Sequence, residues 1–309
     1  MTRALRFLAT VALCASVCPP GFVQEPNKAP LDVAAEDAKA SQGDINAMVK
    51  LGLAYWGKQG IPADLERGKM WLSRAAEAGS FVAQMFLGAA YLSGNGLEKN
   101  PSFAAKYFLQ VAQRQSVDGT LQSSQALAQY WLAMLYEQGK GIDKSHEKAM
   151  QFLQLAARNG NQSAQFDLGT LYNDGTGGMD MDKVHACQLF EKAADQGHII
   201  ASHNAGYCHQ LGLDGKKDLD KAIHYYQISA ERGDATSQHN LAMAFGELGN
   251  AEKAYFWLRV AGSSGYHENN SLIEAAQARL SASQIAQGDK ESAAWLSAHK
   301  AGSAGVPKQ

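Results

Sequence analysis

An excess of positive charge is missing from this sequence, and its absence argues against one large class of partners. The 309 residues contain 28 Lys and Arg against 30 Asp and Glu, which gives a formal net charge of −2. A protein that binds nucleic acid needs a basic face to contact the phosphates, and this pattern of charges supplies none. We therefore expect no nucleic-acid partner.

The apolar run at the start of the chain is too short for a membrane-spanning helix. It extends from Phe7 to Val17 and follows Arg3 and Arg6. A short apolar run behind basic residues is typical of a secretory signal peptide, which we expect over residues 1–18. The interpretation predicts an exported protein, periplasmic or secreted, with no transmembrane segment in the mature chain.

The residues that follow the signal leave the mode of export open. Residues 19–34 contain Pro19, Pro20, Pro26 and Pro30 and are expected to form a disordered leader. The stretch Ala15-Ser16-Val17-Cys18 loosely resembles a bacterial lipoprotein box, with alanine where a leucine-type residue is usual. A lipid anchor on Cys18 is therefore the alternative to soluble export.

Cysteine is also rare, with four in the whole chain. Two of them lie in the signal segment, so the mature chain keeps Cys187 and Cys208, about equally far from the turn at Gly197-His198. That spacing places the two side chains at one level of two antiparallel helices. They form either a disulfide, if their Cα atoms lie within about 7 Å in an oxidising compartment, or two small buried thiols.

Recognisable catalytic motifs are missing as well. No nucleophile elbow, paired carboxylates or Cys-His arrangement occurs at a diagnostic spacing. The segments Gly94-Asn95-Gly96, Gly139-Lys140-Gly141 and Gly175-Thr176-Gly177-Gly178 lack both the Gly-Lys-Ser/Thr ending and the preceding strand of a phosphate-binding loop, so they are predicted to be turns. We predict no catalytic residue and no cofactor.

Histidines gather late in the chain without a metal-binding spacing. Six of the nine lie between residues 185 and 239. His203 and His239 occupy the same position of successive repeats, which shared ancestry explains, and His203 and His209 are six residues apart, so they point to different sides of a helix. We therefore predict no metal site.

What the sequence does contain is a repeat. A small residue, followed three positions later by an aromatic residue or histidine, recurs six times at steps of 36, 45, 36, 37 and 36 residues. The six pairs are Gly52 and Tyr55, Gly88 and Tyr91, Ala133 and Tyr136, Gly169 and Tyr172, Gly206 and His209, and Ala242 and Phe245. A period in this range indicates a solenoid, in which each repeat buries its apolar face against its neighbours.

The second half of every repeat follows the same pattern, which begins with a capping residue at the start of a helix. The caps are Asp64, Asn100, Ser145, Asp182, Asp218 and Asn250. Within that helix a small residue is followed three positions later by a bulky one. The small residues are Gly68, Ala104, Ala149, Ala186, Ala222 and Ala254, and the bulky ones are Trp71, Tyr107, Phe152, Leu189, Tyr225 and Trp257. We expect the bulky side chain to fill the space that the small residue leaves on the facing helix.

Both ends depart from the repeat pattern, as the caps of a solenoid do. Residues 34–42 predict a lone helix that covers the first repeat, and residues 270–280 and 283–299 predict two closing helices. The fold is therefore predicted to be all-α: a right-handed α-solenoid of about six helix-turn-helix repeats with helical caps at both ends. We expect the solenoid over residues 35–309, with repeats over 43–265 and C-terminal capping helices over 266–300.

The third and fourth repeats carry a recognisable combination of residues. They contain Ala128-Gln129, Tyr136, Gly139-Lys140-Gly141-Ile142, Lys148-Ala149, Ala156-Ala157 and Gly160, and then Ala164-Gln165, Leu168-Gly169, Tyr172, Ala193-Ala194 and Gly197. This succession resembles the Sel-one-like repeat (SLR), a relative of the tetratricopeptide repeat, over roughly residues 43–265. The fifth and sixth repeats depart most, with His209 or Phe245 at the tyrosine position and no Gly-x-Gly loop.

The resemblance implies an α-solenoid adaptor and no reaction. In bacteria such proteins are often exported and tied to envelope signalling, cell-surface assembly or host contact. In tetratricopeptide-type solenoids the positions −3, +1 and +4 from the small residue of each first helix line a concave groove. We expect the partner-binding residues there: Tyr130, Met134, Phe166, Thr170, Asn173, His203, Tyr207, Gln210 and His239. The alternative is that this stripe covers the core of adjacent repeats.

The function predicted from these observations is a non-catalytic adaptor of the bacterial envelope or exterior that binds a protein or peptide in the groove. Two alternatives remain open. One is a hydrolase that acts on cell-wall-like or β-lactam substrates, and the other is an architectural envelope lipoprotein anchored through Cys18.

Overall fold

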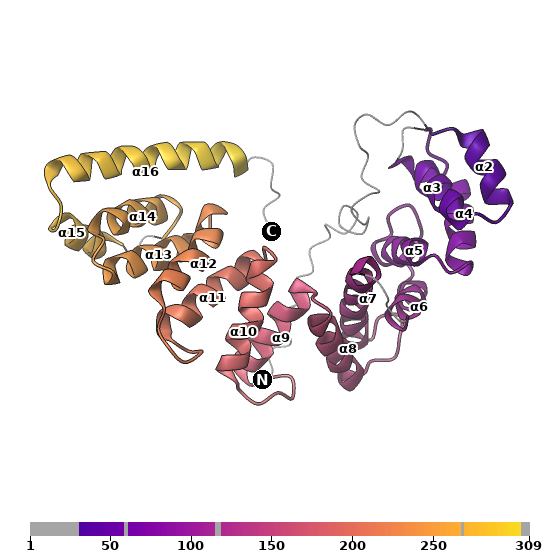
Figure 1. Ribbon diagram of the computed structural model, residues 1–309, viewed down its shortest axis with the longest axis horizontal. Helices are drawn as coiled ribbons and strands as arrows, with labels where there is room; N and C mark the ends of the chain where they lie inside the picture. The colour runs from indigo at the N-terminus through magenta and orange to yellow at the C-terminus, as the bar shows by residue number, and fades with distance from the viewer. Residues whose placement is uncertain (1–30, 59–60, 115–118, 267–268, 304–309) are drawn as a thin grey trace. The chain divides into compact units, whose positions relative to one another are not determined.

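The computed structural model describes residues 31–58, 61–114, 119–266 and 269–303. Every regular element among them is helical (Figure 1). None of the helices in this part of the chain is both long enough and apolar enough to cross a bilayer. The predicted signal peptide 1–18 and most of the predicted leader 19–34 lie outside the described residues.

The chain divides into two compact units, Met1–Asn161 and Gln162–Gln309. The described part of the first unit contains α2 (Val33–Ser41), α3 (Ile45–Leu53), the π-helical turn η1 (Ala54–Lys58), α4 (Leu65–Glu77), α5 (Phe81–Ser93), α6 (Pro101–Ala112), α7 (Gly119–Gln138) and α8 (His146–Arg158). The second unit contains α9 (Gln162–Asp174), α10 (Lys183–Asp195), α11 (Ile199–Leu211), α12 (Leu219–Glu231), α13 (Ala235–Glu247), α14 (Ala251–Ser263), α15 (Asn270–Gln277) and α16 (Ala282–Ser303).

The helices pair as the repeat pattern predicts. In each unit a first helix packs on the second helix of its own repeat and on the neighbours along the chain, as for α11 with α12 and α13 with α14. This confirms an all-α solenoid. The extra residues of the third repeat lengthen its first helix, α7, which has 20 residues where most others have 13.

The six predicted caps are confirmed. Each accepts a hydrogen bond from the backbone N–H three residues later, which satisfies a donor that the first turn of a helix leaves unpaired. The capping residues are Asp64, Asn100, Ser145, Asp182, Asp218 and Asn250.

Small and large residues interlock between the two helices of a repeat, at the small residue of the first helix. The side chain that covers it comes from the residue after the bulky one of the second helix: a Cβ added at Gly206 would lie 2.6 Å from the ring of Tyr226. The bulky residue itself stacks on the aromatic position of the first helix, as Tyr107 does on Tyr91 with ring centroids 6.2 Å apart. The second helix therefore contributes two adjacent large side chains to the core, and they point to neighbouring places on the first helix.

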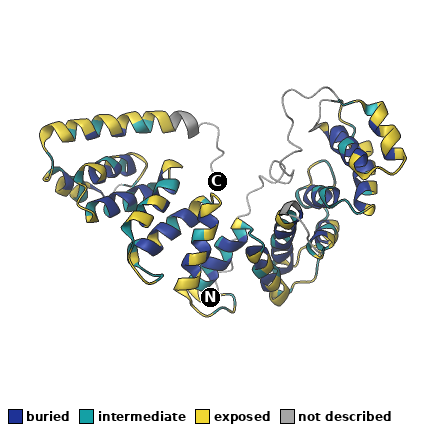
Figure 2. Ribbon diagram, in the orientation of Figure 1, coloured by how far each residue is buried: buried dark blue, intermediate teal, exposed yellow. Residues whose placement is uncertain are grey.

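The buried residues follow the contact faces of the helices (Figure 2), and the end helices close the two units. In the first unit Ala40 of α2 joins the core with Leu51 and Leu72. In the second unit Trp295 of α16 meets Trp257 edge to face with centroids 5.4 Å apart, and the backbone of Gly288 passes over the ring of Tyr255. These contacts explain why both ends depart from the repeat pattern.

Candidate functional site

The predicted partner-binding stripe is partly accessible in the second unit. Its residues lie on the first helices α9, α11 and α13, and all are half-buried except Tyr207, which is 47% exposed. The half-buried members are Phe166, Thr170, Asn173, His203, Gln210 and His239. Tyr207 is therefore the most accessible aromatic side chain of the stripe.

Several stripe residues hold neighbouring repeats together through hydrogen bonds. His203 Nδ1 lies 2.8 Å from Ser237 Oγ on α13, and Gln210 Nε2 donates to Glu247 Oε1 at 3.0 Å. His239 Nδ1 lies 2.7 Å from Asn269 Oδ1. These side chains serve the stacking of the solenoid and still expose part of their surface.

The aromatic member of α9 is also packed rather than free. Phe166 stacks on His198 with ring centroids 4.6 Å apart and lies against Phe190 at 6.0 Å. Thr170 donates a hydrogen bond back to the carbonyl oxygen of Phe166, and Asn173 donates to Asp174. These contacts orient the half-buried side chains of α9.

Three exposed apolar residues follow one face of α11, and two of them were missed by the sequence prediction. Ile200 is 55% exposed, Tyr207 47% and Leu211 52%. Their spacings of seven and four residues place them on one side of the helix. We call Ile200, Tyr207 and Leu211 the α11 strip. The signal that could have found Ile200 and Leu211 was this spacing from Tyr207.

The two predicted residues of the first unit differ in accessibility. Tyr130 is half-buried and contacts Trp131 with ring centroids 6.0 Å apart. Met134 is only 4% exposed, so it belongs to the core and offers no surface for a partner. The predicted set is thus divided between the units, with Phe166 and Tyr207 in the second.

Ser237, His203 and Asp234 lie close together in the second unit, but their arrangement differs from a hydrolytic triad. Ser237 Oγ and Asp234 Oδ2 both approach Nδ1 of His203, at 2.8 and 3.5 Å. A triad needs the nucleophile and the acid on opposite ring nitrogens, and Ser237 is fully buried. Burial raises the pKa of Asp234, but hydrogen bonds from His203 and Ser237 outweigh it and lower the pKa to about 2. The group is a helix cap.

Cys187 and Cys208 form a disulfide between α10 and α11, with their Cα atoms 5.8 Å apart. Both residues are buried, at 2% and 3% exposure. The covalent bond joins the helix that carries the α11 strip to the second helix of the preceding repeat.

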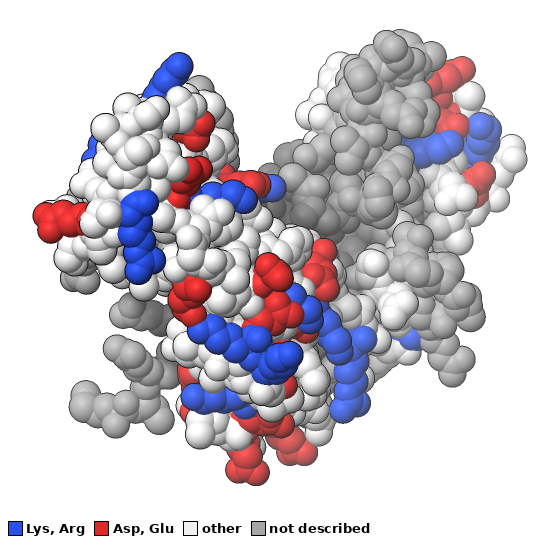
Figure 3. Space-filling view, turned by 60° about the vertical axis from the view of Figure 1, so that its left-hand side comes forward, with Lys and Arg blue, Asp and Glu red and all other residues white. Residues whose placement is uncertain are grey.

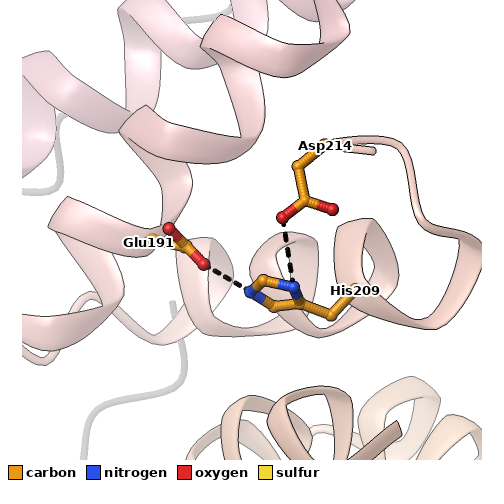
Figure 4. A group of neighbouring side chains, drawn as sticks. All are labelled: Glu191, His209 and Asp214. Carbon is orange, nitrogen blue, oxygen red and sulfur yellow. Dashed lines mark hydrogen bonds and ion pairs between the residues drawn. The ribbon is translucent and has the colours of Figure 1, made fainter. Parts of the chain in front are cut away.

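One group of side chains near the disulfide has the composition of a metal site. Glu191, His209 and Asp214 each offer one ligand atom, and these atoms lie within 4.8 Å of one another (Figure 4). Nε2 of His209 contacts Glu191 Oε1, and its Nδ1 lies 3.3 Å from Asp214 Oδ2. The sequence prediction of no metal site considered histidine spacing alone and missed the two carboxylates.

Charges of both signs are mixed on the face of the molecule drawn in Figure 3, with basic and acidic side chains next to one another. This distribution agrees with the near-zero net charge of the chain.

Comparison with protein families and known structures agrees with the repeat. Six segments match a family model described as Sel1 repeat: residues 45–80, 82–116, 126–161, 162–198, 199–234 and 235–266. Among solved structures, the protective antigen c5321 of uropathogenic Escherichia coli, which has an SLR fold, superposes with a TM-score of 0.66 at 25% identity. The match covers 85% of this chain and 56% of the antigen.

Two curated relatives show the range of proteins with similar repeats. DAP3-binding cell death enhancer 1 of Rattus norvegicus is 28% identical over 245 residues, which span 79% of this chain and 46% of the rat protein. The ERAD-associated E3 ubiquitin-protein ligase component HRD3B of Arabidopsis thaliana is 29% identical over 217 residues, spanning 68% of this chain and 34% of the plant protein. The chain thus spans less than half the length of either relative.

Proposed function

Because the chain belongs to the Sel1 repeat family, we propose that it is a non-catalytic adaptor that binds a partner protein along the first helices of its second unit. Sel1 repeat proteins are generally protein-interaction adaptors. The names of the rat and plant relatives agree with such a role, since one is a DAP3-binding protein and the other a component of a ligase.

The observation that carries the proposal is the α11 strip. An exposed apolar side chain on its own is ordinary, but three on one helix face form a continuous contact for a partner. Along α11 the side chains of Ile200, Tyr207 and Leu211 are spaced by about 10 and 6 Å, which suits apolar residues on a partner helix or extended peptide. Tyr207 is the expected anchor, because large aromatic side chains dominate binding energy once desolvated.

The half-buried polar residues around the α11 strip would form hydrogen bonds that fix the position of the partner along the strip. Gln210 and His203 already have partners within the solenoid, so they present ordered rather than mobile hydrogen-bonding groups. An ordered surface loses less conformational entropy on binding.

Export is the second part of the proposal. The apolar segment Phe7 to Val17 supports it, and so does the bond between Cys187 and Cys208, since structural disulfides persist mainly in oxidising compartments. We place the adaptor in the periplasm or outside the cell, with the lipid-anchored form through Cys18 as the variant to test by mass spectrometry.

The proposal is tested by capturing partners with a strip variant beside a matched control. The strip variant carries Ile200→Ser, Tyr207→Ala and Leu211→Ser, and the control carries Met181→Ser and Val184→Ser, which replace apolar residues with 65% and 46% exposure elsewhere in the same unit. We expect a partner that the wild type and the control capture and the strip variant loses. Capture of the same proteins by both variants would refute the assignment of the site.

A further inference from the structure

Three residues at the junction of the fourth and fifth repeats depart together from the pattern that the other repeats follow. His209 stands where the other five repeats have Tyr or Phe, and Asp214 stands where the first four have the second glycine of the loop: Gly60, Gly96, Gly141 and Gly177. Glu191 is the only acid at its position of the second helix, where the other repeats have Ser73, Leu109, Gln154, Gln227 and Arg259.

These three departures meet in space. Glu191 comes from α10, His209 from α11 and Asp214 from the loop that follows α11 (Figure 4). His209 is 1% exposed, whereas the side chains of the two carboxylates are about one-quarter exposed. Three unrelated changes in two neighbouring repeats would rarely converge by accident, and together they form a cluster of one imidazole and two carboxylates.

The hydrogen bonding of the cluster is incomplete without a cation. A neutral imidazole carries one N–H, so it can donate to one carboxylate only, and its other nitrogen then faces an acceptor. Both nitrogens of His209 face carboxylate oxygens, and Asp214 Oδ1 is buried with no hydrogen-bond partner among the described residues. A proton on His209 would satisfy the ring, but it would leave that oxygen unpaired. A metal ion on one ring nitrogen leaves the other nitrogen its proton to donate, and Asp214 Oδ1 gains a partner when the carboxylate turns onto the ion.

The surroundings allow an ion to enter. His209 and Asp214 line a cavity of about 740 Å³. Lys221 Nζ lies 3.8 Å from Glu191 Oε1 and its side chain is 58% exposed, so it can move into solvent when a cation takes its place. Asp214 lies between Gly212 and Gly215, which have φ of 67° and 130°, so the loop has the backbone freedom to bring the carboxylate closer.

We propose that Glu191, His209 and Asp214 bind one divalent transition-metal ion. Imidazole and carboxylate ligands suit ions of the Zn²⁺ type, and three protein ligands leave a coordination position open toward the cavity. The Cys187–Cys208 disulfide fixes the site, because Cys187 is one turn before Glu191 on α10 and Cys208 directly precedes His209 on α11. The metal site is independent of the proposed partner site.

The test uses variants that restore the repeat's own pattern. His209→Tyr and Asp214→Gly give the fifth repeat the residues of its neighbours, so the double variant should fold, which its circular dichroism and thermal melt will show. The control is His224→Gln, which removes an exposed histidine of α12 outside the cluster. Zinc titrations by calorimetry are made with the disulfide intact, since free thiolates would bind zinc themselves.

We expect the wild type and His224→Gln to bind one equivalent of Zn²⁺ and to melt at a higher temperature with it. The pattern-restoring variant should bind at least about tenfold more weakly and show no such rise. Two results would overturn the proposal. One is a wild type without stoichiometric zinc binding, and the other is a double variant that binds zinc as tightly as the wild type.

Discussion

At the scale of single residues, the tightest packing occurs where a ring of a second helix covers a glycine of the first. Gly169 is one such position, since a Cβ there would lie 2.9 Å from the ring of buried Phe190. Gly262 of α14 offers the contrast, because nothing lies within 4 Å of its added Cβ. Both glycines are helical, so the two sites differ in the space around them.

We therefore expect Gly169→Leu to destabilise the chain by about 2–3 kcal/mol or more through overpacking. Gly262→Leu should be neutral or stabilise by up to about 1 kcal/mol, because leucine favours a helix over glycine. Urea unfolding of both variants measures the difference. Equal effects would contradict the packing assigned to the first helices.

A second prediction at this scale concerns acid stability. The pKa of Asp234 is 3.8 in its ordinary state and about 2 in the fold, so the folded chain holds this proton more weakly than the unfolded chain does. The carboxylate therefore adds stability that is present above about pH 4 and is lost as the pH falls from 4 to 2. Asp234→Asn keeps a capping side chain but does not titrate in this range.

In urea unfolding series at several pH values, Asp234→Asn should be less stable than the wild type at neutral pH, and the gap should close between pH 4 and pH 2. Other carboxyl groups titrate alike in both proteins, so the gap isolates Asp234. A gap of constant size across the series would show that the carboxylate's charge contributes nothing.

At the scale of elements, the disulfide is the strongest tie between two helices of the second unit. It closes a sequence separation of 21 residues between α10 and α11. A cross-link of that length stabilises a fold by about 3 kcal/mol in the chain-entropy account. We expect reductant to lower the thermal midpoint of the wild type and to leave a Cys187→Ala, Cys208→Ala variant unchanged. A wild type that melts identically with and without reductant would show that this bond is not formed in solution.

The helices and their caps could be predicted because their signals recur. A capping residue at the start of the second helix is a local signal that recurs in every repeat. Examples are Asn100, followed by Pro101, and Asp182 at the same position two repeats later. Tyr226 covers Gly206, whereas the adjacent Tyr225 stacks on His209. The rotation of one helix against the other decides between the two residues, and the spacing within a single helix does not fix that rotation.

The candidate sites were less predictable, because they depend on how repeats stack. Met134 and Tyr207 share one repeat position, yet one is buried and the other is 47% exposed. The cluster around His209 draws Glu191 from 18 positions earlier in the chain, and Glu191 belongs to no motif. Only the comparison of equivalent positions among the six repeats marks them as unusual.

At the scale of the whole molecule, each unit of the solenoid needs covered ends. In the second unit the Trp295 side chain of α16 covers the ring of Trp257. The Tyr255 hydroxyl donates a hydrogen bond to Asp289 Oδ1 of α16 at 2.8 Å. We expect a chain that ends at Gly265 to aggregate, since the loss of α15 and α16 exposes these rings. A chain that ends at Ser303 is the control, and light scattering after size exclusion compares the two. A soluble, monomeric product ending at Gly265 would mean that α15 and α16 are not a cap.

The central claim is that the protein acts as an adaptor through the α11 strip, and site-specific photo-crosslinking in living cells tests it most directly. A photoreactive amino acid replaces Tyr207 in one sample and Val184 of α10 in the control, and mass spectrometry identifies the adducts. We predict a partner protein attached at position 207, absent at 184, and lost when Ile200 and Leu211 are changed to serine. Identical adducts at both positions, or none at 207, would contradict the claim.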